Sequence, residues 1–199
     1  MPDTRDTVLL AALRVLGREG VAGASTRAIA AEAGVNVATL HYHFGSKDAL
    51  LAEVVELLSA QFADTVRAAI PTDGGVREVL DRGVRAVYRL ARETEGLQLA
   101  QYELTTAALR AGETERARAQ YASYHRVIVE VVEETLQQSG ETICVPVEDL
   151  VRFLVAGMDG LILSALVLPK AQSQRALDLF VKAAIALADI RPARSRRSA

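Results

Sequence analysis

Cysteine is almost absent from this chain of 199 residues, and Cys144 is the only one. A disulfide within the chain is therefore impossible, and a single thiol fits the reducing cytoplasm, where we expect the protein to reside. We interpret Cys144 as an inert small residue in preference to a thiol sensor. The first residues are charged and amphipathic instead of continuously apolar, so we expect no signal peptide.

Sequence signatures of catalysis and of metal binding are also missing. The chain has no Gly-x-Ser-x-Gly motif, no P-loop and no dinucleotide-binding glycine pattern. His41 and His43 point about 200° apart on a helix, so they cannot share an ion, and the third histidine, His125, is far along the chain. No Cys/His ligand spacing exists either. We therefore predict no enzyme, no metal ion and no cofactor.

A strong charge of one sign and an uninterrupted membrane-spanning run are missing as well. The 23 basic and 25 acidic residues leave a formal net charge of −2, which neither favours nor excludes a nucleic-acid partner. Residues 150–168 are apolar enough to suggest a membrane span, but they contain Arg152 and Asp159 and end at Pro169. Because a charge at the middle of a bilayer is costly, we interpret this run as a buried helix and expect no membrane partner.

A helical pattern runs through nearly the whole chain. Half of the residues are hydrophobic, enough for a sizeable core, and apolar residues recur at three- and four-residue steps. We predict an all-α fold of about nine helices, over residues 4–18, 26–33, 37–44, 47–69, 76–94, 97–111, 113–138, 147–168 and 171–190. The Arg- and Ser-rich residues at the end of the chain are predicted to be disordered.

The most informative stretch is residues 26–44. Four apolar residues have a spacing that points them into one small core between two short helices, and they are Ile29, Ala33, Val35 and Leu40. Gly34 stands where the first helix must end and the chain must turn, which usually requires a positive φ. Asn36 follows as an N-cap for the next helix. This pattern predicts a helix-turn-helix, whose second helix places its N-terminal residues at base edges in the major groove.

The sequence around this motif makes it more specific. The string is Ala38-Thr39-Leu40-His41-Tyr42-His43-Phe44, followed by Gly45-Ser46-Lys47-Asp48-Ala49-Leu50-Leu51. Together with the long amphipathic helix before it, it resembles the N-terminal domain of the TetR family of transcriptional regulators over about residues 4–51. Two features depart from the family pattern: His41 stands where Tyr is usual, and the first 50 residues are not basic. Binding should therefore depend on a few well-placed contacts and should still weaken with salt.

The resemblance implies a domain organisation and a function. It implies an N-terminal three-helix helix-turn-helix domain (residues 1–50), a C-terminal helical ligand-binding and dimerisation domain (51–190) and a disordered basic tail (191–199). It also implies a homodimer that represses transcription from a palindromic operator in double-stranded DNA. An unknown small-molecule effector would release it by shifting the population between two conformations.

The expected DNA contacts lie on the second short helix and at helix starts. The leading and outward positions of that helix should meet base edges, while Tyr42 and His43 are assigned to phosphate by the resemblance. Residues at helix starts should meet phosphates. The expected contacts are Val37, Ala38, Thr39, Tyr42 and His43, with Thr26, Arg27 and Lys47 at helix starts. Both orientations of His41 remain open.

The last two helices are the candidates for dimerisation. The first carries a seam of small residues at four-residue steps, and the second carries a broad apolar stripe. The resemblance implies that these helices form a four-helix bundle with a second subunit, and packing within one subunit is the alternative. The expected interface residues are Ala156, Gly160, Ser164, Leu177, Phe180, Val181, Ala184 and Ile185.

The middle helices should enclose the effector, again by resemblance. An apolar cavity with a few polar groups is what a small-molecule site requires. The candidates are Gln61, Phe62, Thr65, Tyr88, Gln98, Tyr102, Thr105, Tyr121, His125, Met158 and Asp159. For each of them an ordinary place in the core or on the surface is an equally good interpretation.

Two other functions fit the same pattern. A regulator controlled by a protein partner or by its abundance would bind DNA and no small molecule. A helical carrier or sequestering protein would bind an apolar ligand without binding a specific DNA sequence.

Overall fold

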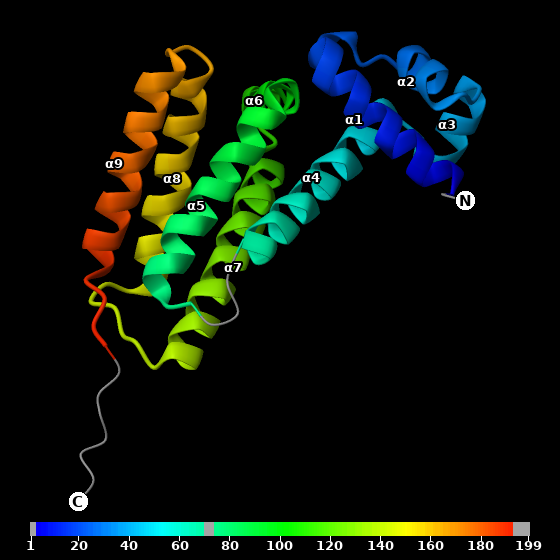
Figure 1. Cartoon of the computed structure of the whole chain (residues 1–199). Coiled ribbons are helices and arrows are strands. Elements are labelled where there is room, and N and C mark those ends of the chain that lie inside the picture. The colour runs from blue at the N-terminus through cyan, green and yellow to red at the C-terminus, as the bar shows by residue number, and fades with distance from the viewer. Residues whose placement is uncertain (1–2, 70–73, 193–199) are drawn as a thin grey trace, which may run out of the picture. The chain divides into compact units, whose positions relative to one another are not determined.

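The computed structural model describes residues 3–69 and 74–192, and nine helices lie within these ranges (Figure 1). In chain order they are α1 (Thr4–Gly23), α2 (Thr26–Ala33), α3 (Val37–Phe44), α4 (Lys47–Ala69), α5 (Val76–Glu93), α6 (Glu95–Arg110), α7 (Thr114–Ser139), α8 (Val147–Ala165) and α9 (Lys170–Ala188). The all-α prediction is confirmed, and most helix ends fall within about three residues of those predicted. In the described part, none of these helices is long and apolar enough to cross a membrane.

The end of the chain adds one contact that the sequence did not predict. Thr142 and Arg191 form an isolated antiparallel bridge, with backbone hydrogen bonds of 3.0 and 2.9 Å. Arg191, the first residue of the predicted disordered tail, is therefore ordered. Residues 193–199 of that tail lie outside the described residues.

Helix α1 is longer than predicted because it continues past Gly20. Gly20 has φ 69° and ψ −176°, which breaks the helix, yet the chain resumes helical geometry up to Gly23. The break leaves the Val21 amide without a helical acceptor, and a Glu103 carboxylate oxygen on α6 accepts its hydrogen bond at 2.8 Å. A residue 82 positions away thus makes the extension possible, and no local pattern indicates it.

The described residues form two compact units. The first comprises the chain up to Gln61 together with Glu93–Gln120, and the second comprises Phe62–Arg92 together with the chain from Tyr121. Helices α4 and α7 each contribute to both units. Helix α6 belongs to the unit that contains the helix-turn-helix. This unit therefore includes residues that lie well beyond the expected domain boundary at residue 50.

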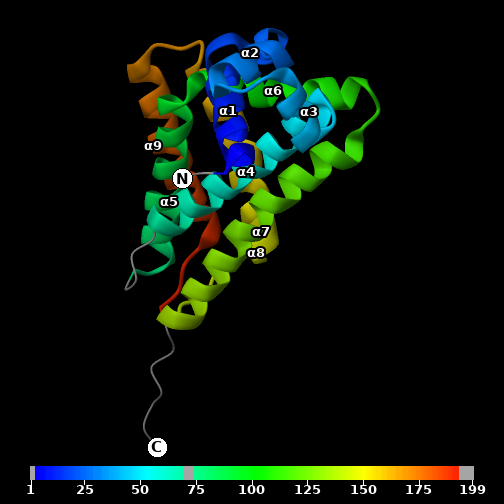
Figure 2. The same ribbon diagram turned by 90° about the vertical axis from the view of Figure 1, so that its right-hand side faces the viewer.

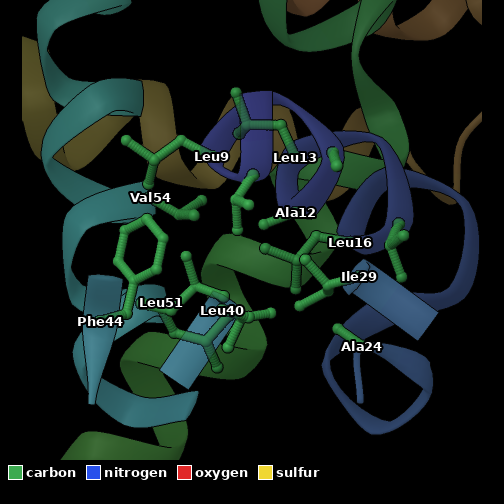
Figure 3. Packing of buried hydrophobic residues seen from close by; sticks show 14 of the residues in the cluster. Leu9, Ala12, Leu13, Leu16, Ala24, Ile29, Leu40, Phe44, Leu51 and Val54 are labelled. Atoms are coloured by element: carbon green, nitrogen blue, oxygen red, sulfur yellow. The ribbon is translucent and has the colours of Figure 1, made fainter. Parts of the chain in front are cut away.

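The first unit is built around α1. Its buried side chains converge from α1, α2, α3 and the start of α4 in Figure 3, which labels Leu9, Ala12, Leu13, Leu16, Ala24, Ile29, Leu40, Phe44, Leu51 and Val54. Helix α6 packs against α1 so closely that a Cβ at Gly96 would collide with the Gly17 carbonyl. Figure 2 shows α2 and α3 gathered beside α1 from a second direction. The helix-turn-helix therefore rests on an apolar core to which α6 also contributes.

The second unit contains α5, α8, α9 and the later parts of α4 and α7. Helix α5 is strongly amphipathic and buries one stripe, made of Val76, Val79, Leu80, Val84, Tyr88 and Ala91. Helices α8 and α9 pack against each other (Figure 1). Pro169 is the N-cap of α9. A guanidinium nitrogen of Arg85 on α5 donates to Asp178 on α9 at 2.6 Å.

Candidate nucleic-acid interface and effector site

The turn between α2 and α3 is held by short-range hydrogen bonds. Ser25 Oγ accepts from the Ala28 amide at 3.1 Å and caps α2. Gly34 ends α2 with φ 70°, a left-handed conformation that glycine adopts without strain. Asn36 Oδ1 accepts from the Thr39 amide at 2.7 Å and caps α3. The predicted positive φ at Gly34 and the predicted cap at Asn36 are both confirmed, so the two helices are joined rigidly.

Helix α3 has one face in the core and one face in solvent. Leu40 and Phe44 are buried, and Tyr42 on the opposite side is 86% exposed. Among the other expected DNA contacts on α3, Ala38 is exposed, while Val37, Thr39 and His43 are half-buried. His41 is exposed as well, and its Nδ1 lies 3.0 Å from the Gly45 carbonyl oxygen. The orientation of His41 is thereby settled toward solvent.

Two expected contacts on α3 are partly engaged inside the protein. The Val37 side chain packs against the buried core of the first unit, so less of it is available to a base. The Thr39 hydroxyl donates to Asn36 Oδ1 at 2.9 Å. That hydroxyl keeps its lone pairs, and its methyl group is unaffected by the hydrogen bond.

Most of the arginines near the helix-turn-helix are neutralised by carboxylates. Arg14 and Arg18 of α1 both bind Glu32 of α2, at 2.8 and 3.2 Å. Hydrogen bonds from Arg14 and Arg18 lower the pKa of Glu32 below its ordinary value, so this carboxylate stays ionised. These contacts tie α1 to α2 and leave little net charge there for DNA.

Arg27 and Lys47 are placed differently. Arg27 is exposed in the first turn of α2, and no ion pair to it occurs within residues 3–69 and 74–192. Lys47 is half-buried, and its Nζ donates to the Val21 carbonyl at 3.2 Å. Thr26 is half-buried at the start of α2. Cationic groups at helix starts suit phosphate oxygens, because the N-terminal end of a helix carries partial positive charge.

Arg5 is a residue whose role the sequence did not reveal. It forms an ion pair with Glu53 of α4 at 2.5 Å, and its guanidinium lies 5.3 Å from the centroid of the Phe44 ring. One side chain of α1 thus contacts both α4 and the end of α3. The sequence did not predict these contacts, because both partners of Arg5 are about 40 or more positions away along the chain.

The predicted effector residues are divided between the two units. Gln61, Gln98, Tyr102 and Thr105 belong to the first, and Gln61 is exposed. Thr105 lines a cavity of about 300 Å³ that lies wholly in this unit, with walls from α1, α4, α6 and α7. The sequence did not predict the other residues that line it, which include Lys47, Leu51, Leu104, Ala108 and Gln120.

The second unit brings together the other polar candidates around Asp159. The Tyr121 hydroxyl on α7 donates to Asp159 Oδ2 on α8 at 2.7 Å. The Tyr124 ring lies 4.6 Å from the Phe62 ring and 6.3 Å from the Tyr121 ring, measured between centroids. Burial raises the pKa of Asp159 above its ordinary value, and the hydrogen bond from Tyr121 partly opposes this. Tyr124 links the predicted Phe62 to the predicted Tyr121, although it was not itself predicted.

The remaining candidates of the second unit are Thr65, Tyr88, His125 and Met158. Tyr88 and Met158 are buried, and Thr65 is half-buried. His125 Nε2 lies 3.3 Å from the Glu148 carbonyl oxygen. In the described ranges, no group of three or more His, Cys, Asp or Glu side chains is placed to hold a metal ion.

The predicted dimerisation residues lie in two kinds of environment. Leu177, Val181 and Ala184 are buried within one chain, so they cannot offer surface to a partner, and this part of the prediction is corrected. Phe180 stacks on Phe153 at 5.1 Å, and Ile185 and Ser164 are half-buried. The stripe on α9 was predicted correctly as apolar, but it faces its own chain because α9 packs against α8 there.

A different apolar surface is exposed on the same two helices. We call it the α8–α9 face, and it consists of Phe153, Ala156, Gly160, Leu163 and Val167 on and just after α8, with Leu179, Ala183, Ala186 and Leu187 on α9. The α8 members recur at alternating steps of three and four residues. Leu163 is 54% exposed, Val167 80% and Leu179 58%. The small residues Ala156 and Gly160 from the predicted seam belong to this face.

Known proteins resemble the chain over both of its parts. The model for bacterial regulatory proteins of the tetR family matches residues 8–54. The model for a tetracyclin repressor-like C-terminal domain matches residues 74–187, more than half of the chain.

Individual relatives and solved structures agree with the family models. The chain is 28% identical over 159 residues to the HTH-type nicotine-responsive transcriptional repressor HdnoR of Paenarthrobacter nicotinovorans, with 79% of this chain and 81% of that protein covered. It is 34% identical over 124 residues to the HTH-type transcriptional regulator BetI of Rhizobium meliloti (strain 1021), with 61% and 60% covered. The crystal structure of a transcriptional regulator from Rhodococcus sp. Rha1 shares the fold, with a TM-score of 0.76 at 21% identity over 96% of this chain and 100% of that one. The chain therefore belongs to the TetR family of bacterial transcriptional regulators.

Proposed function

We propose that this regulator is a homodimeric repressor that binds an inverted repeat in double-stranded DNA through α3 and is released by a small molecule. The observation that carries the proposal is the geometry of α3. Leu40 and Phe44 fix the helix in the core, while Tyr42 on its opposite side is 86% exposed. A capped, rigidly supported helix with a solvent-facing polar side is suited to the major groove.

The proposed DNA contacts follow the placement of each side chain. Ala38 and the Thr39 methyl group meet thymine methyl groups, and Val37 makes a smaller apolar contact because part of it is packed inside. Tyr42 and His43 reach phosphate oxygens from the exposed side of α3. Phosphate contacts at the helix starts come from Thr26, Arg27 and Lys47.

A second copy of the chain is the proposed occupant of the α8–α9 face. Its α8 residues recur with the three-and-four spacing of a helix that packs along another helix, and they are exposed in the single chain. Contiguous exposed apolar surface marks an interaction site, and a two-fold axis lets one such face cover its own copy. Dimerisation supplies the second recognition helix, about 34–36 Å from the first, that an inverted repeat requires.

Release by a small molecule is supported by a relative and by chemistry in the second unit. HdnoR is described as a nicotine-responsive repressor, and the chain resembles it over most of both lengths. The Tyr121–Asp159 contact places polar groups among aromatic rings, as a small-molecule site requires. The carrier hypothesis is not favoured by relatives that are named as transcriptional regulators.

Selection of bound duplexes from a random DNA pool, at near-physiological salt, tests this proposal. We expect enrichment of an inverted repeat and, with that duplex, a complex of two chains per site in sedimentation analysis. Enrichment of a single half-site would contradict the dimer. A folded protein that enriches no sequence would contradict the regulator itself and favour the carrier hypothesis.

A further inference from the structure

We propose that the effector is an organic cation, a protonated amine or quaternary ammonium ion with an apolar body, whose charge binds between Asp159 and the aromatic rings of Phe62, Tyr121 and Tyr124. The inference rests on the proposed function, because it names the class of effector that the second unit takes. All four residues belong to that unit.

The first step is the position of Asp159. It is half-buried on α8, a helix whose buried residues include Leu154, Met158 and Ile162. A carboxylate that is partly buried loses hydration, and in Asp159 this loss raises the pKa. A cationic ligand would restore favourable interactions to the ionised form. Perturbed carboxylates of this kind are candidates for function when a specific geometry surrounds them.

The second step is that geometry. Three aromatic rings from α4 and α7 are neighbours in space. The ring centroids are 4.6 Å apart between Phe62 and Tyr124 and 6.3 Å apart between Tyr124 and Tyr121. The face of an aromatic ring carries negative potential and attracts an ammonium group within about 6 Å of its centroid. The Tyr121 hydroxyl also points its proton at Asp159, at 2.7 Å, which helps to hold the carboxylate in one orientation.

The third step is the sign of the ligand's charge. A carboxylate and the faces of aromatic rings all favour a cation and disfavour an anion. A neutral ligand gains apolar contacts there and at most a hydrogen bond to Asp159, without the attraction between opposite charges. The cluster therefore selects for positive charge as well as for an apolar body.

The fourth step is access. Phe62, Tyr121, Tyr124 and Asp159 are each half-buried, so each retains surface that a small molecule can reach. Met158, the residue before Asp159 in the chain, is buried. A purely structural tie between α7 and α8 would use the same Tyr121–Asp159 hydrogen bond, and the two roles differ in what they predict for ligand charge.

Matched probes that differ in charge distinguish these roles. Calorimetric titration of the full chain would use three apolar bodies, phenylbutyl, naphthylmethyl and decyl, each as an ammonium, an alcohol and a carboxylate. We expect at least one ammonium probe to bind about tenfold or more tightly than its matched alcohol, and the carboxylates to bind most weakly. Equal affinity of ammonium and alcohol for every body would overturn the proposal.

Substitutions assign the effect to Asp159. Asp159→Asn keeps the shape and removes the charge, so it should abolish the preference for the ammonium and leave the alcohol unchanged. Tyr121→Phe removes only the hydroxyl and should weaken the ammonium a few-fold, and it is the variant to use if Asp159→Asn does not fold. Asp149→Asn is the matched control, because Asp149 is exposed on the same helix and is paired with Arg152. A preference that survives in Asp159→Asn, or one that is undiminished in Tyr121→Phe where Asp159→Asn does not fold, would contradict the assignment.

Operator binding, measured on the same preparations, separates the two proposals. If the protein selects an operator and no ammonium probe is preferred, the effector class is wrong and the regulator stands. If ammonium probes bind through Asp159 and no operator is selected, the site stands and the regulator is wrong. Support for both requires that the bound ammonium weaken operator binding in the wild type and not in Asp159→Asn.

Discussion

The helix-turn-helix and the Asp159 cluster use polar side chains in opposite ways. Asn36 and Thr39 are three residues apart, and their hydrogen bond satisfies a helix end that would otherwise need water. Tyr121 and Asp159 are 38 residues apart, and the Tyr121 hydroxyl donates to the Asp159 carboxylate. Burial of that carboxylate disfavours its ionised form. The first contact specifies a local shape, whereas the second maintains a charge at a cost. A polar contact that closes a helix end stabilises the fold through neighbours in the sequence, whereas the Tyr121 hydrogen bond, between distant residues, only partly offsets the cost of burying Asp159.

The largest expected effect comes from removing the core beneath the recognition helix. Leu40→Ala deletes a fully buried side chain from the centre of the first unit and should reduce the free energy of unfolding by about 2–5 kcal/mol. Urea unfolding followed by circular dichroism measures this loss. Tyr42→Ala, on the exposed side of the same helix, is the control and should change stability by less than about 0.5 kcal/mol. A similar loss in both variants would mean that the two faces of α3 are assigned wrongly.

The second effect concerns two glycines of α8 that differ in their surroundings. A Cβ at Gly160 meets nothing within 4 Å, whereas a Cβ at Gly157 would collide with a carbon of the Phe180 ring. Gly160→Leu should therefore fold normally and weaken the dimer by about tenfold or more, because the new side chain separates the two faces. Sedimentation over a range of concentrations measures this.

The companion substitution tests the interior of the chain. Gly157→Ala should lower the melting temperature even at concentrations where the dimer is complete, because the Phe180 ring must move. If Gly160→Leu sediments as the wild type does, the α8–α9 face is not the interface.

How much the sequence predicts depends on how far apart the partners lie. Gly34, Asn36 and Leu40 were assigned correctly because turn, cap and core spacing are local patterns. The extension of α1 past Gly20 was missed because the acceptor for the freed amide is Glu103, far along the chain. The α9 stripe was recognised as apolar, but periodicity alone does not tell which partner covers it. Tyr124 and Arg5 were missed for the same reason, since each acts through a residue distant in sequence.

The third effect contrasts two arginines of the first unit. Arg27→Ala removes an exposed cation at a helix start from each of the two subunits, so it should weaken operator binding by about 1 kcal/mol per subunit and reduce the slope of log affinity against log salt by about 2 per dimer. Arg14→Ala is the control. The Arg14 guanidinium already binds Glu32, so its removal should leave the salt slope unchanged. Fluorescence anisotropy of a labelled operator at several salt concentrations measures both. Equal slopes for Arg27→Ala and the wild type would remove Arg27 from the contact set.

The smallest effect tests the cost attributed to Asp159 itself. Its folded-state pKa is raised, so its contribution to stability is present below the unfolded-state pKa and is lost as pH rises through the folded-state pKa. At neutral pH the ionised carboxylate is therefore unfavourable, and Asp159→Asn should raise the melting temperature by about 2 °C. The advantage of the variant should shrink as pH falls through the folded-state pKa, where the wild-type carboxyl becomes protonated. Melting curves of both proteins between about pH 4 and pH 8 measure this difference, with Asp149→Asn as the control on the same helix. A variant that is less stable than the wild type at neutral pH would show that the ionised Asp159 stabilises the fold in spite of its burial, and the contrast with Asn36 would then disappear.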